Sequence, residues 1–246
     1  MEKDLLRRFN EICNTGVAIA GYTSGLCGEW VEERFKRLAA ELNIECSMMI
    51  MANQHHTDKV SVMGMEDAGY GIIRPHNDEY MDAMITAQTG VMLCVHTADC
   101  VPVVLLDPVK KAVGIAHSGW VGTSNRIAGK TVRKMVDEYK SRPEDIICAM
   151  GPYNHSCCYE VGEDVLERFR ESFSDTECEM FFEKKKDSGK YMLDLGGAIR
   201  IALHQKGVNQ ENIYDEGHCT YHTSTFSSWR RTGDKKNQIL TYIMLQ

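Results

Sequence analysis

The residues VMLCVHTADCVPVVLLDPVKKAVGIAHSGW, numbers 91 to 120, decide the fold of this 246-residue chain. They contain three short apolar runs, which are interrupted at Asp99, at Pro102 and at Asp107-Pro108. Near-continuous apolar runs of this length are typical of strands buried on both faces. We therefore expect this segment to form the centre of a sheet.

The flanking sequence mixes helices and strands along its whole length. Val31, Phe35, Leu38 and Leu42 follow one another at spacings of four, three and four, which predicts an amphipathic helix over 30–42. Further helices are expected over 124–139, 163–173 and 194–206, and strands over 44–51, 60–63, 146–150, 213–215 and 239–245. Because strict βα alternation, internal repeats and proline-rich linkers are absent from the sequence, we expect an α+β fold with a single domain over 1–246.

Charge and apolar content exclude several classes of protein. The 28 Lys and Arg against 35 Asp and Glu give a net charge of −7, which supplies no overall field for nucleic acid or an anionic membrane. The longest apolar stretch, 100–106, is far shorter than the ~20 residues of a membrane span. The first twenty residues contain no apolar region typical of a signal peptide. We therefore expect a cytoplasmic protein whose ten cysteines are reduced and mostly buried.

Three reactive side chains interrupt or follow the predicted strands: His56, Cys100 and His117. One thiolate and two imidazoles would make a three-ligand zinc site that leaves a fourth position for water or substrate. The same atoms would also serve a cysteine hydrolase, with Cys100 as nucleophile and His117 as base. Since the spacing matches no compact zinc motif, a buried free cysteine and two unrelated histidines remain a third interpretation.

Six ordered segments resemble the laccase-domain family. They are QHHTDKV (54–60), HTADCVPVVLLDP (96–108), AHSGW (116–120), GPYNHSCCYEVG (151–162), DLGGAIRIALHQKGV (194–208) and CTYHTSTFSSWRR (219–231). This family was first labelled multicopper polyphenol oxidase and is described as zinc-dependent purine nucleoside phosphorylase with adenosine deaminase activity. The resemblance runs from about residue 20 to residue 246, and it implies mixed sheets layered between helices.

The resemblance also implies roles for individual residues. The family's metal ligands fall on His56, which comes two residues after a glutamine, on Cys100 and on His117. Asp99, Ser118, Gly119 and Trp120 would shape the site around the ligands, and Arg230 and Arg231 match the family's paired arginines. A guanidinium fork suits phosphate or the oxygens of a substrate. A surface ion pair is the alternative for both arginines.

Two basic positions of the family pattern are missing from this chain. Gly25 stands where the family usually has a basic residue, and Val121 replaces an arginine after the His-x-Gly-Trp motif. Both changes remove positive charge from the expected phosphate site. The retained ligands therefore support a metal site more firmly than they support phosphorolysis.

The activity implied by the resemblance has two parts. Purine nucleosides such as adenosine, inosine, guanosine and methylthioadenosine would react with inorganic phosphate to give the base and ribose 1-phosphate. Adenosine would also be deaminated, because zinc lowers the pKa of bound water to about 7 and so activates it for attack at C6. Copper phenol oxidation is the weaker alternative, since one thiolate triad falls short of a multicopper chain. The oligomeric state stays open, and a monomer is compatible with the sequence.

Two further groups of His and Cys side chains also suggest metal ligands. The first is His155, Cys157 and Cys158, and the second is His218, Cys219 and His222. Because vicinal cysteines rarely chelate one ion together, we expect the first group to form a loop. The family match near Cys219 favours a cavity wall or a core strand for the second. His96, four residues before Cys100, is expected to support the ligands or to be a core histidine.

Overall fold

The apolar segment forms three successive strands, as its sequence predicts. They are β6 (Met92–Thr97), β7 (Val101–Asp107) and β8 (Ala112–Ser118). Every residue of β7 and β8 is buried, which explains why these runs lack regularly placed polar residues. The computed structural model describes the chain except for residues 1–5, 26–30, 77–78, 187 and 235–236.

The three strands belong to two different sheets, which corrects the single central sheet expected from the sequence. Strand β6 lies in a five-stranded sheet, whereas β7 and β8 lie in a six-stranded sheet. The chain crosses between them in the bend at residues 98–100, where Asp99 has a φ of 90°. A non-glycine residue adopts such a φ only rarely. The crossover therefore depends on a backbone conformation that apolar patterning does not report.

Both large sheets mix parallel and antiparallel pairing. Their strand orders are β1-β2-β14-β6-β3 and β13-β9-β7-β8-β5-β4, and a small antiparallel sheet has the order β10-β12-β11. The other strands are β1 (Arg7–Arg8), β2 (Ala18–Tyr22), β3 (Met49–Met51), β4 (Val60–Val62), β5 (Ala83–Thr86), β9 (Ile147–Met150), β10 (Glu160–Val161), β11 (Phe182–Lys184), β12 (Tyr191–Leu193), β13 (Ile213–Asp215) and β14 (Ile239–Leu245). Strand β14 is late in the chain but lies between β2 and β6.

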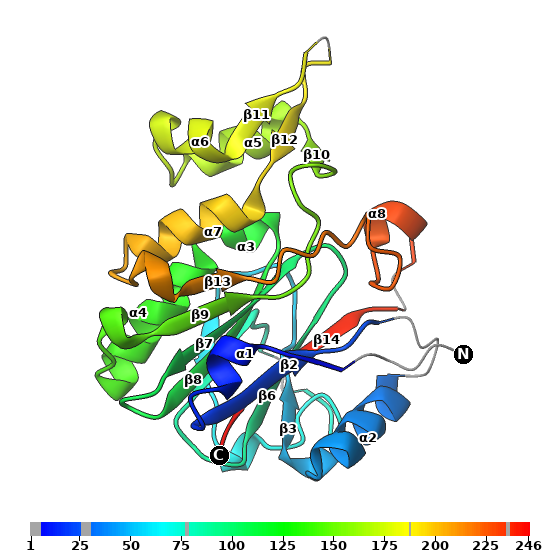
Figure 1. Cartoon of the computed structure of the whole chain (residues 1–246), viewed down its shortest axis with the longest axis vertical. Helices are drawn as coiled ribbons and strands as arrows, with labels where there is room; N and C mark the ends of the chain where they lie inside the picture. Colours follow the sequence, from blue (N-terminus) through cyan, green and yellow to red (C-terminus); the bar gives the residue numbers. More distant parts are fainter. Residues whose placement is uncertain (1–5, 26–30, 77–78, 187, 235–236) are drawn as a thin grey trace.

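Helices and sheets form layers (Figure 1). The helices are α1 (Asn10–Cys13), α2 (Val31–Leu42), α3 (Trp120–Ser124), α4 (Ile127–Tyr139), α5 (Glu163–Arg170), α6 (Asp175–Phe181), α7 (Leu195–His204) and α8 (Trp229–Thr232). The two large sheets pack face to face, with α4 and α7 on the outer face of the six-stranded sheet and α2 on that of the five-stranded sheet. The expected α+β fold, with mixed sheets between helices, is confirmed.

Strand β7 shows how one run of apolar residues serves two cores. Val103 and Leu105 pack toward the helices, whereas Val104 and Leu106 pack between the sheets. This division follows from the alternation of side chains along a strand. Because both faces are covered, the strand reads as continuously apolar rather than alternating.

Several predicted elements have different boundaries in the structure. The helix expected over 124–139 begins only at Ile127, as α4, because Arg126 adopts a left-handed φ of 60°; Ser124 instead ends α3, a helix that was not predicted. The strand expected over 44–51 is shortened to β3, because Cys46–Met48 forms a 3₁₀ turn. Helix α2 begins at Val31, and Trp30, its expected first residue, lies outside the described residues. Helix α7 begins after Asp194, whose carboxylate accepts the Gly197 N–H as an N-cap.

The small sheet and helices α5 and α6 stand at one end of the molecule (Figure 1). Phe169, Phe173 and Phe181 pack ring against ring there, with centroids 5.2 to 5.7 Å apart. The polar stretch at 183–190, expected as a surface turn, links β11 to β12. In the described part of the chain, we find no helix with the length and apolar character needed to cross a membrane.

Candidate metal centre and its cavity

His56, Cys100 and His117 lie together, although they come from three separate parts of the chain. Their ligand atoms lie within 4.8 Å of one another, and Cys100 Sγ is 3.9 Å from His56 Nε2. The two imidazole rings meet edge to face, with centroids 4.9 Å apart. Zinc accepts a set of one thiolate and two imidazoles, and copper accepts it as well. The donors present therefore fit a metal ion of this class.

Each ligand is placed by the end of a strand. His56 precedes β4, Cys100 follows the crossover and leads into β7, and His117 lies near the end of β8. Gly119 lets these segments approach closely, because a Cβ there would lie 2.9 Å from His56 Cδ2 and 3.0 Å from Cys100 Sγ. A side chain at this position would displace both ligands.

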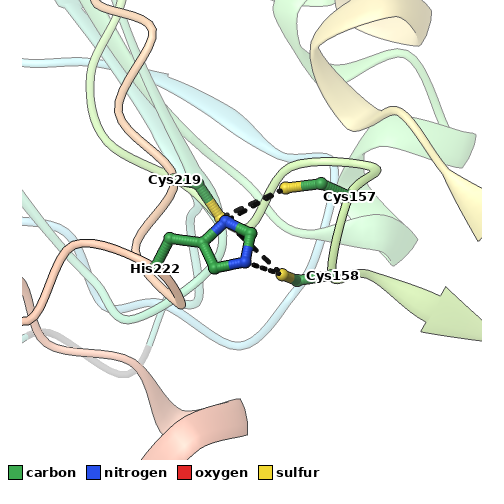
Figure 2. A group of neighbouring side chains, drawn as sticks. All are labelled: Cys157, Cys158, Cys219 and His222. Carbon is green, nitrogen blue, oxygen red and sulfur yellow. Dashed lines mark hydrogen bonds between the residues drawn. The ribbon is translucent and has the colours of Figure 1, made fainter.

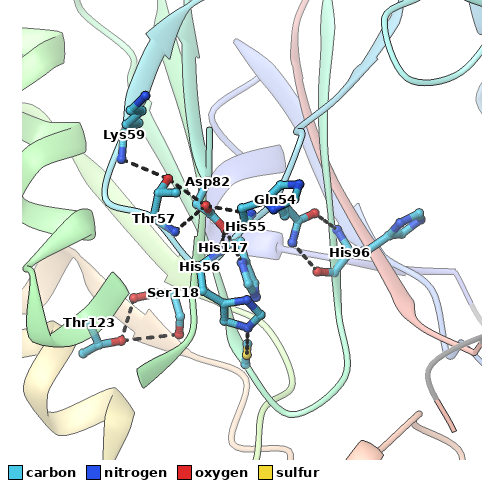
Figure 3. A network of polar contacts seen from close by, with 11 residues as sticks. Gln54, His55, His56, Thr57, Lys59, Asp82, His96, His117, Ser118 and Thr123 are labelled. Atoms are coloured by element: carbon cyan, nitrogen blue, oxygen red, sulfur yellow. Dashed lines mark hydrogen bonds and ion pairs between the residues drawn. The ribbon is translucent and has the colours of Figure 1, made fainter. Parts of the chain in front are cut away.

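Asp82 orients both histidines, and sequence reasoning missed it. This carboxylate is fully buried at the start of β5, and the His117 Nδ1–H donates to its Oδ1 over 2.7 Å (Figure 3). The hydrogen bond fixes the His117 tautomer and leaves Nε2 for a metal, as in many carboxylate–histidine–metal arrangements. Strands β5 and β8 pair antiparallel, which brings Asp82 beside His117.

The same carboxylate also fixes the backbone around His56. The N–H groups of His55, His56 and Thr57 all donate to Asp82, over 3.1, 3.1 and 2.6 Å. This closure holds His56 at a φ of 56°, a conformation that is rare outside glycine. His55 takes no part in the ligand group, and its ring lies against Tyr80 with centroids 3.7 Å apart. The structure thus places His56, and not His55, in the group.

Charges within the group favour a thiolate at Cys100. Burial alone would raise the pKa of Cys100, but the His117 and His56 side chains lower it to about 6. Burial would lower the pKa of His117, but Cys100 and Asp82 raise it to about 9. For Asp82, the hydrogen bonds from His117 and Thr57 outweigh burial and lower the pKa to about 2. Metal ligands must be deprotonated at sulfur, so this setting prepares Cys100 for a cation.

The three ligands lie in the wall of a cavity of about 770 Å³, within the usual range for small-molecule sites. Aromatic rings of Trp120, Tyr159 and Trp229 line it together with Asp99 and Arg230. The other lining residues are Met51, Ala52, Asn53, Gln54, Gly71, His76, His96, Thr97, Ala98, Asp234 and Gln238. A flat aromatic ligand with polar edges suits such a lining.

Asp99 and Ser118 are placed differently from each other. Asp99 lines the cavity, but its carboxylate is occupied: Oδ1 accepts the Thr220 hydroxyl over 2.6 Å and Oδ2 accepts the Arg230 N–H over 2.6 Å. Asp99 therefore links the bend at residues 98–100 to the first turn of α8. Ser118 is fully buried, and its Oγ lies 2.8 Å from Thr123 Oγ1 (Figure 3). Its side chain thus supports the turn into α3.

The paired arginines also separate. Arg230 lines the cavity, and its guanidinium donates to the Glu160 carbonyl over 3.0 Å and lies over the Tyr159 ring. Arg231 instead donates to the backbone carbonyls of Thr220, Tyr221 and Phe226. Arg231 therefore stabilises the 219–231 segment, and of the two arginines it is Arg230 whose guanidinium faces the cavity, where it could bind an anion through the N–H groups that Glu160 does not accept.

Gly25 and Val121 stand at the two positions where the family pattern has a basic residue, and the structure describes both. Gly25 has a φ of 79°, and a Cβ there would lie 2.7 Å from Ser227 Oγ and 2.9 Å from the Gln238 backbone. A larger residue would not fit this conformation of the loop. Val121 lies in α3, directly after Trp120. Of the lining residues that the structure describes, Arg230 is the only arginine or lysine.

His96 has an imidazole nitrogen available to a ligand. Its backbone is held by the Gln54 side chain through two hydrogen bonds, of 2.7 and 2.8 Å. Its Nε2 is buried and has no hydrogen-bond partner in the described structure. Burial, with smaller contributions from Arg34 and His117, lowers the pKa of His96 to about 3. The ring is therefore neutral near pH 7 and lines the cavity.

The two other His and Cys groups do not stay separate. Cys157 and Cys158 from the first group meet Cys219 and His222 from the second (Figure 2). Sequence reasoning treated them as a loop and a cavity wall, because nothing in the sequence pairs positions that are 62 residues apart. Of the nine cysteines described, all free, only four are buried, which is fewer than expected.

Known proteins are similar to this chain over most of its length. A family model described as multi-copper polyphenol oxidoreductase laccase matches residues 20–246. The purine nucleoside phosphorylase LACC1 of Homo sapiens is 34% identical over 82% of this chain, which spans 45% of that protein. An adenosine deaminase, RL5, from an unknown prokaryotic organism is 34% identical, over 84% of this chain and 78% of its own. The crystal structure of a hypothetical protein, YfiH, from Bacillus licheniformis has a TM-score of 0.91 and 27% identity, covering 100% of this chain and 98% of that one.

Proposed function

The chain belongs to the multi-copper polyphenol oxidoreductase laccase family, and we propose that it is a zinc-dependent purine nucleoside enzyme. The proposed reactions are phosphorolysis of adenosine, inosine, guanosine or methylthioadenosine to the base and ribose 1-phosphate, and hydrolytic deamination of adenosine. The names of its relatives, purine nucleoside phosphorylase and adenosine deaminase, support this choice.

The ligand group of His56, Cys100 and His117 in the wall of the cavity carries the proposal. Three protein ligands are the number found in catalytic zinc sites, because a fourth position must stay open for water or substrate. A zinc ion bound there would act as a Lewis acid and would lower the pKa of water. The 770 Å³ cavity has room for a nucleoside and phosphate together.

The surrounding residues would bind and orient the substrate. Trp120, Tyr159 and Trp229 offer aromatic surface to a purine. His96 Nε2, buried and unpartnered, would form a hydrogen bond with a polar edge of the nucleoside. Asp82 would keep His117 in the tautomer that binds metal. We assign Asp82 as a positioning residue, since its carboxylate accepts hydrogen bonds from His117 and from the segment 55–57 that carries His56.

Phosphate recognition would depend on Arg230. Its guanidinium is exposed at the cavity and suits an oxyanion. Because Gly25 and Val121 bring no charge, we expect a high KM for phosphate. Deamination needs no phosphate, so the same observation favours adenosine deamination as the stronger of the two activities.

The ionisation of Cys100 and His117 supports one further candidate. A thiolate beside an imidazolium also characterises cysteine hydrolases, and the pKa values of about 6 and about 9 describe such a pair. A metal-independent Cys-His hydrolase is therefore the second candidate function. Copper phenol oxidation remains third, because the triad supplies a single thiolate.

The test combines metal analysis with two assays. Purified protein is stripped with a chelator, reloaded with Zn²⁺ or with Cu²⁺, and assayed for hypoxanthine release from inosine with and without phosphate. Ammonia release from adenosine is measured in parallel. We expect both reactions to disappear on chelation and to return with zinc, with the deaminase reaction independent of phosphate.

The proposed compartment is the cytoplasm, where thiolate ligands stay reduced.

Other outcomes would redirect the assignment. Hydrolysis of an ester or amide substrate by fully chelated protein would favour the Cys-His hydrolase. Recovery of phenol oxidation with Cu²⁺, without nucleoside turnover, would favour the oxidase. Turnover of neither nucleoside by protein loaded with zinc would overturn the proposal.

A further inference from the structure

A second group of ligands lies beside the catalytic cavity. Cys157 and Cys158 lie in the loop between β9 and β10, and Cys219 and His222 lie in the segment between β13 and α8 (Figure 2). Four potential metal ligands thus meet where two distant parts of the chain come together. The group shares no residue with the cavity ligands.

The distances within this group match a tetrahedral zinc site. Cys157 Sγ lies 3.7 Å from Cys219 Sγ and 3.6 Å from His222 Nδ1, and Cys158 Sγ lies 3.9 Å from the same nitrogen and 3.3 Å from His222 Nε2. Binding through Nδ1 alone would therefore need a small rotation of the His222 ring away from Cys158. Ligand bonds of 2.3 Å to sulfur and 2.0–2.1 Å to nitrogen give about 3.8 Å between sulfurs and about 3.6 Å between sulfur and nitrogen in a tetrahedron. All four ligand atoms lie within 4.8 Å of one another.

The backbone holds the two segments in register. The Thr220 N–H donates to the Tyr153 carbonyl over 2.9 Å, and the Tyr153 N–H donates to the His218 carbonyl over 3.2 Å. The Thr223 N–H donates to the Cys219 carbonyl over 2.9 Å, a turn that brings His222 back toward Cys219. The resulting Cys-x-x-His spacing is a common zinc chelate. The group is therefore organised by contacts other than those among its own side chains.

We propose that Cys157, Cys158, Cys219 and His222 bind a second zinc ion. Vicinal cysteines rarely share an ion, but here both Sγ atoms lie within 3.9 Å of His222 Nδ1, so their side chains turn toward one point. Three thiolates and one imidazole complete a tetrahedral shell, so this site has no open position and is structural rather than catalytic. Cys157 and His222 are exposed and Cys219 is buried, which places the ion near the surface and within reach of metal from solution.

The second ion would support the wall of the cavity. Tyr159, one residue beyond Cys158, lines the cavity, and Thr220, one residue beyond Cys219, holds the Asp99 carboxylate. The ion would thus clip together the two segments that carry these residues. Losing it should raise KM for nucleosides more than it lowers kcat, because the catalytic ligands lie on other segments.

A disulfide is the competing use of the same atoms. Cys157 Sγ and Cys219 Sγ lie 3.7 Å apart, whereas a disulfide bond is about 2.05 Å long. Closing the bond would transfer two electrons to an external oxidant and release two protons from the two thiols, and it would leave Cys158 and His222 without the other half of the site. Intact mass then distinguishes the two, since oxidation lowers the mass of the chain by about 2 Da.

The test counts zinc in the full-length protein by elemental analysis and native mass spectrometry after dialysis. We expect two zinc ions per chain in the wild type, one in Cys157→Ser and His222→Ala, and one in Cys100→Ala, which loses the cavity ion. Cys46→Ser is the matched control, since Cys46 belongs to neither group, and it should retain two. Cys157 and His222 are exposed, so their replacement spares the core; Cys219→Ser serves as a third variant.

Cobalt provides a readout that does not depend on activity. Cys100→Ala loaded with Co²⁺ should show the strong thiolate-to-metal absorption of a site with three sulfurs, and Cys157→Ser a weaker band. Three outcomes would overturn the proposal: one zinc in the wild type that Cys100→Ala loses entirely, two zinc ions retained in both Cys157→Ser and His222→Ala, or a disulfide linking Cys157 to Cys219. Because the zinc count separates the sites, failure of the proposed nucleoside activity would leave this test unaffected.

Discussion

The chain carries two groups of Cys and His side chains that differ in number, burial and support. His56, Cys100 and His117 lie in a cavity wall, with a buried carboxylate behind them. The group that includes Cys157 and Cys219 has four members, is partly exposed, and is supported by backbone bonds and turns. With a zinc ion bound, the first group would leave one coordination position open toward the cavity, and the second would fill all four.

One chain can thus keep a reactive site separate from a site that joins two of its segments. Three ligands with a charged residue behind them create an adjustable site, because the ionisation of each member depends on the others. Four ligands from two segments would join those segments, because together they would fill all four positions of a tetrahedral zinc ion. The useful experiments therefore change one group and test whether the other group is unaffected.

The largest effect is expected from Cys100→Ala. Removal of the single thiolate should lower nucleoside turnover by more than about 100-fold, since loss of even an outer contact costs up to that much. One zinc ion should remain, held by the second group. Nucleoside kinetics and zinc content on the same sample provide the measurement. Turnover close to that of the wild type would contradict the role given to this residue.

The next largest effect is expected when the ionisation of Cys100 is compared with that of Cys158 in metal-free protein. The pKa of Cys100 is about 6, whereas burial and the neighbouring Cys157 raise that of Cys158 to about 12. The thiolate is the reactive form, so iodoacetamide should label Cys100 at pH 7 and lose this reaction as the pH falls through 6. Cys158 should react only in alkali. Peptide mapping against pH measures both, and parallel labelling of both near pH 8.5 would contradict the contrast.

An intermediate effect is expected from Asp82→Asn. The amide cannot accept all the N–H groups that converge on the carboxylate, so His117 loses its fixed tautomer and His56 its backbone support. Zinc affinity of the cavity site should fall about 10- to 100-fold, with the second site unchanged. Competition with a chromogenic chelator measures the two affinities. Asp107→Asn, another buried carboxylate that caps backbone N–H groups, is the control and should spare both sites.

The smallest effect is expected from Gly119→Ala. The added methyl would press on His56 and Cys100, and relieving such overpacking costs about 1–3 kcal/mol. We expect weaker zinc binding in the cavity with unchanged binding at the second group. Gly114→Ala provides the comparison, because its Cβ would meet Thr131 and Ile85 rather than a ligand. Equal loss of zinc in both variants would show that general destabilisation, not ligand displacement, is responsible.

The sequence predicted strand positions better than strand partners. Strands β13 and β14 have the predicted ends, and the ends of β14 are clear in the sequence because its mostly apolar run lies between Gln238 and Gln246. The assignment of β6 and β7 to different sheets depends on the φ of Asp99. The break between α3 and α4 likewise depends on one left-handed residue, Arg126. A positive φ at a single non-glycine residue does not change the spacing of apolar residues, so the sequence pattern could not predict it.

The three candidate ligands were predicted from sequence motifs, whereas the residue that orients them was not predicted. His56, Cys100 and His117 stand in recognisable segments, so the family resemblance selected them. Asp82 is a single acidic residue before a short strand, and only the pairing of β5 with β8 brings it to His117. Cys157 and Cys219 meet through contacts between the segments around Tyr153 and Thr220, which no local pattern announces.

Strand β14 has a consequence for how the chain is made. It forms the middle of the five-stranded sheet, yet its residues leave the ribosome after those of both its neighbours, β2 and β6. During synthesis these two strands must wait with open edges, which are sites for aggregation. A nascent chain stalled before residue 239 would therefore need chaperones, and the cavity walls beside β14 would form only after that strand has been made.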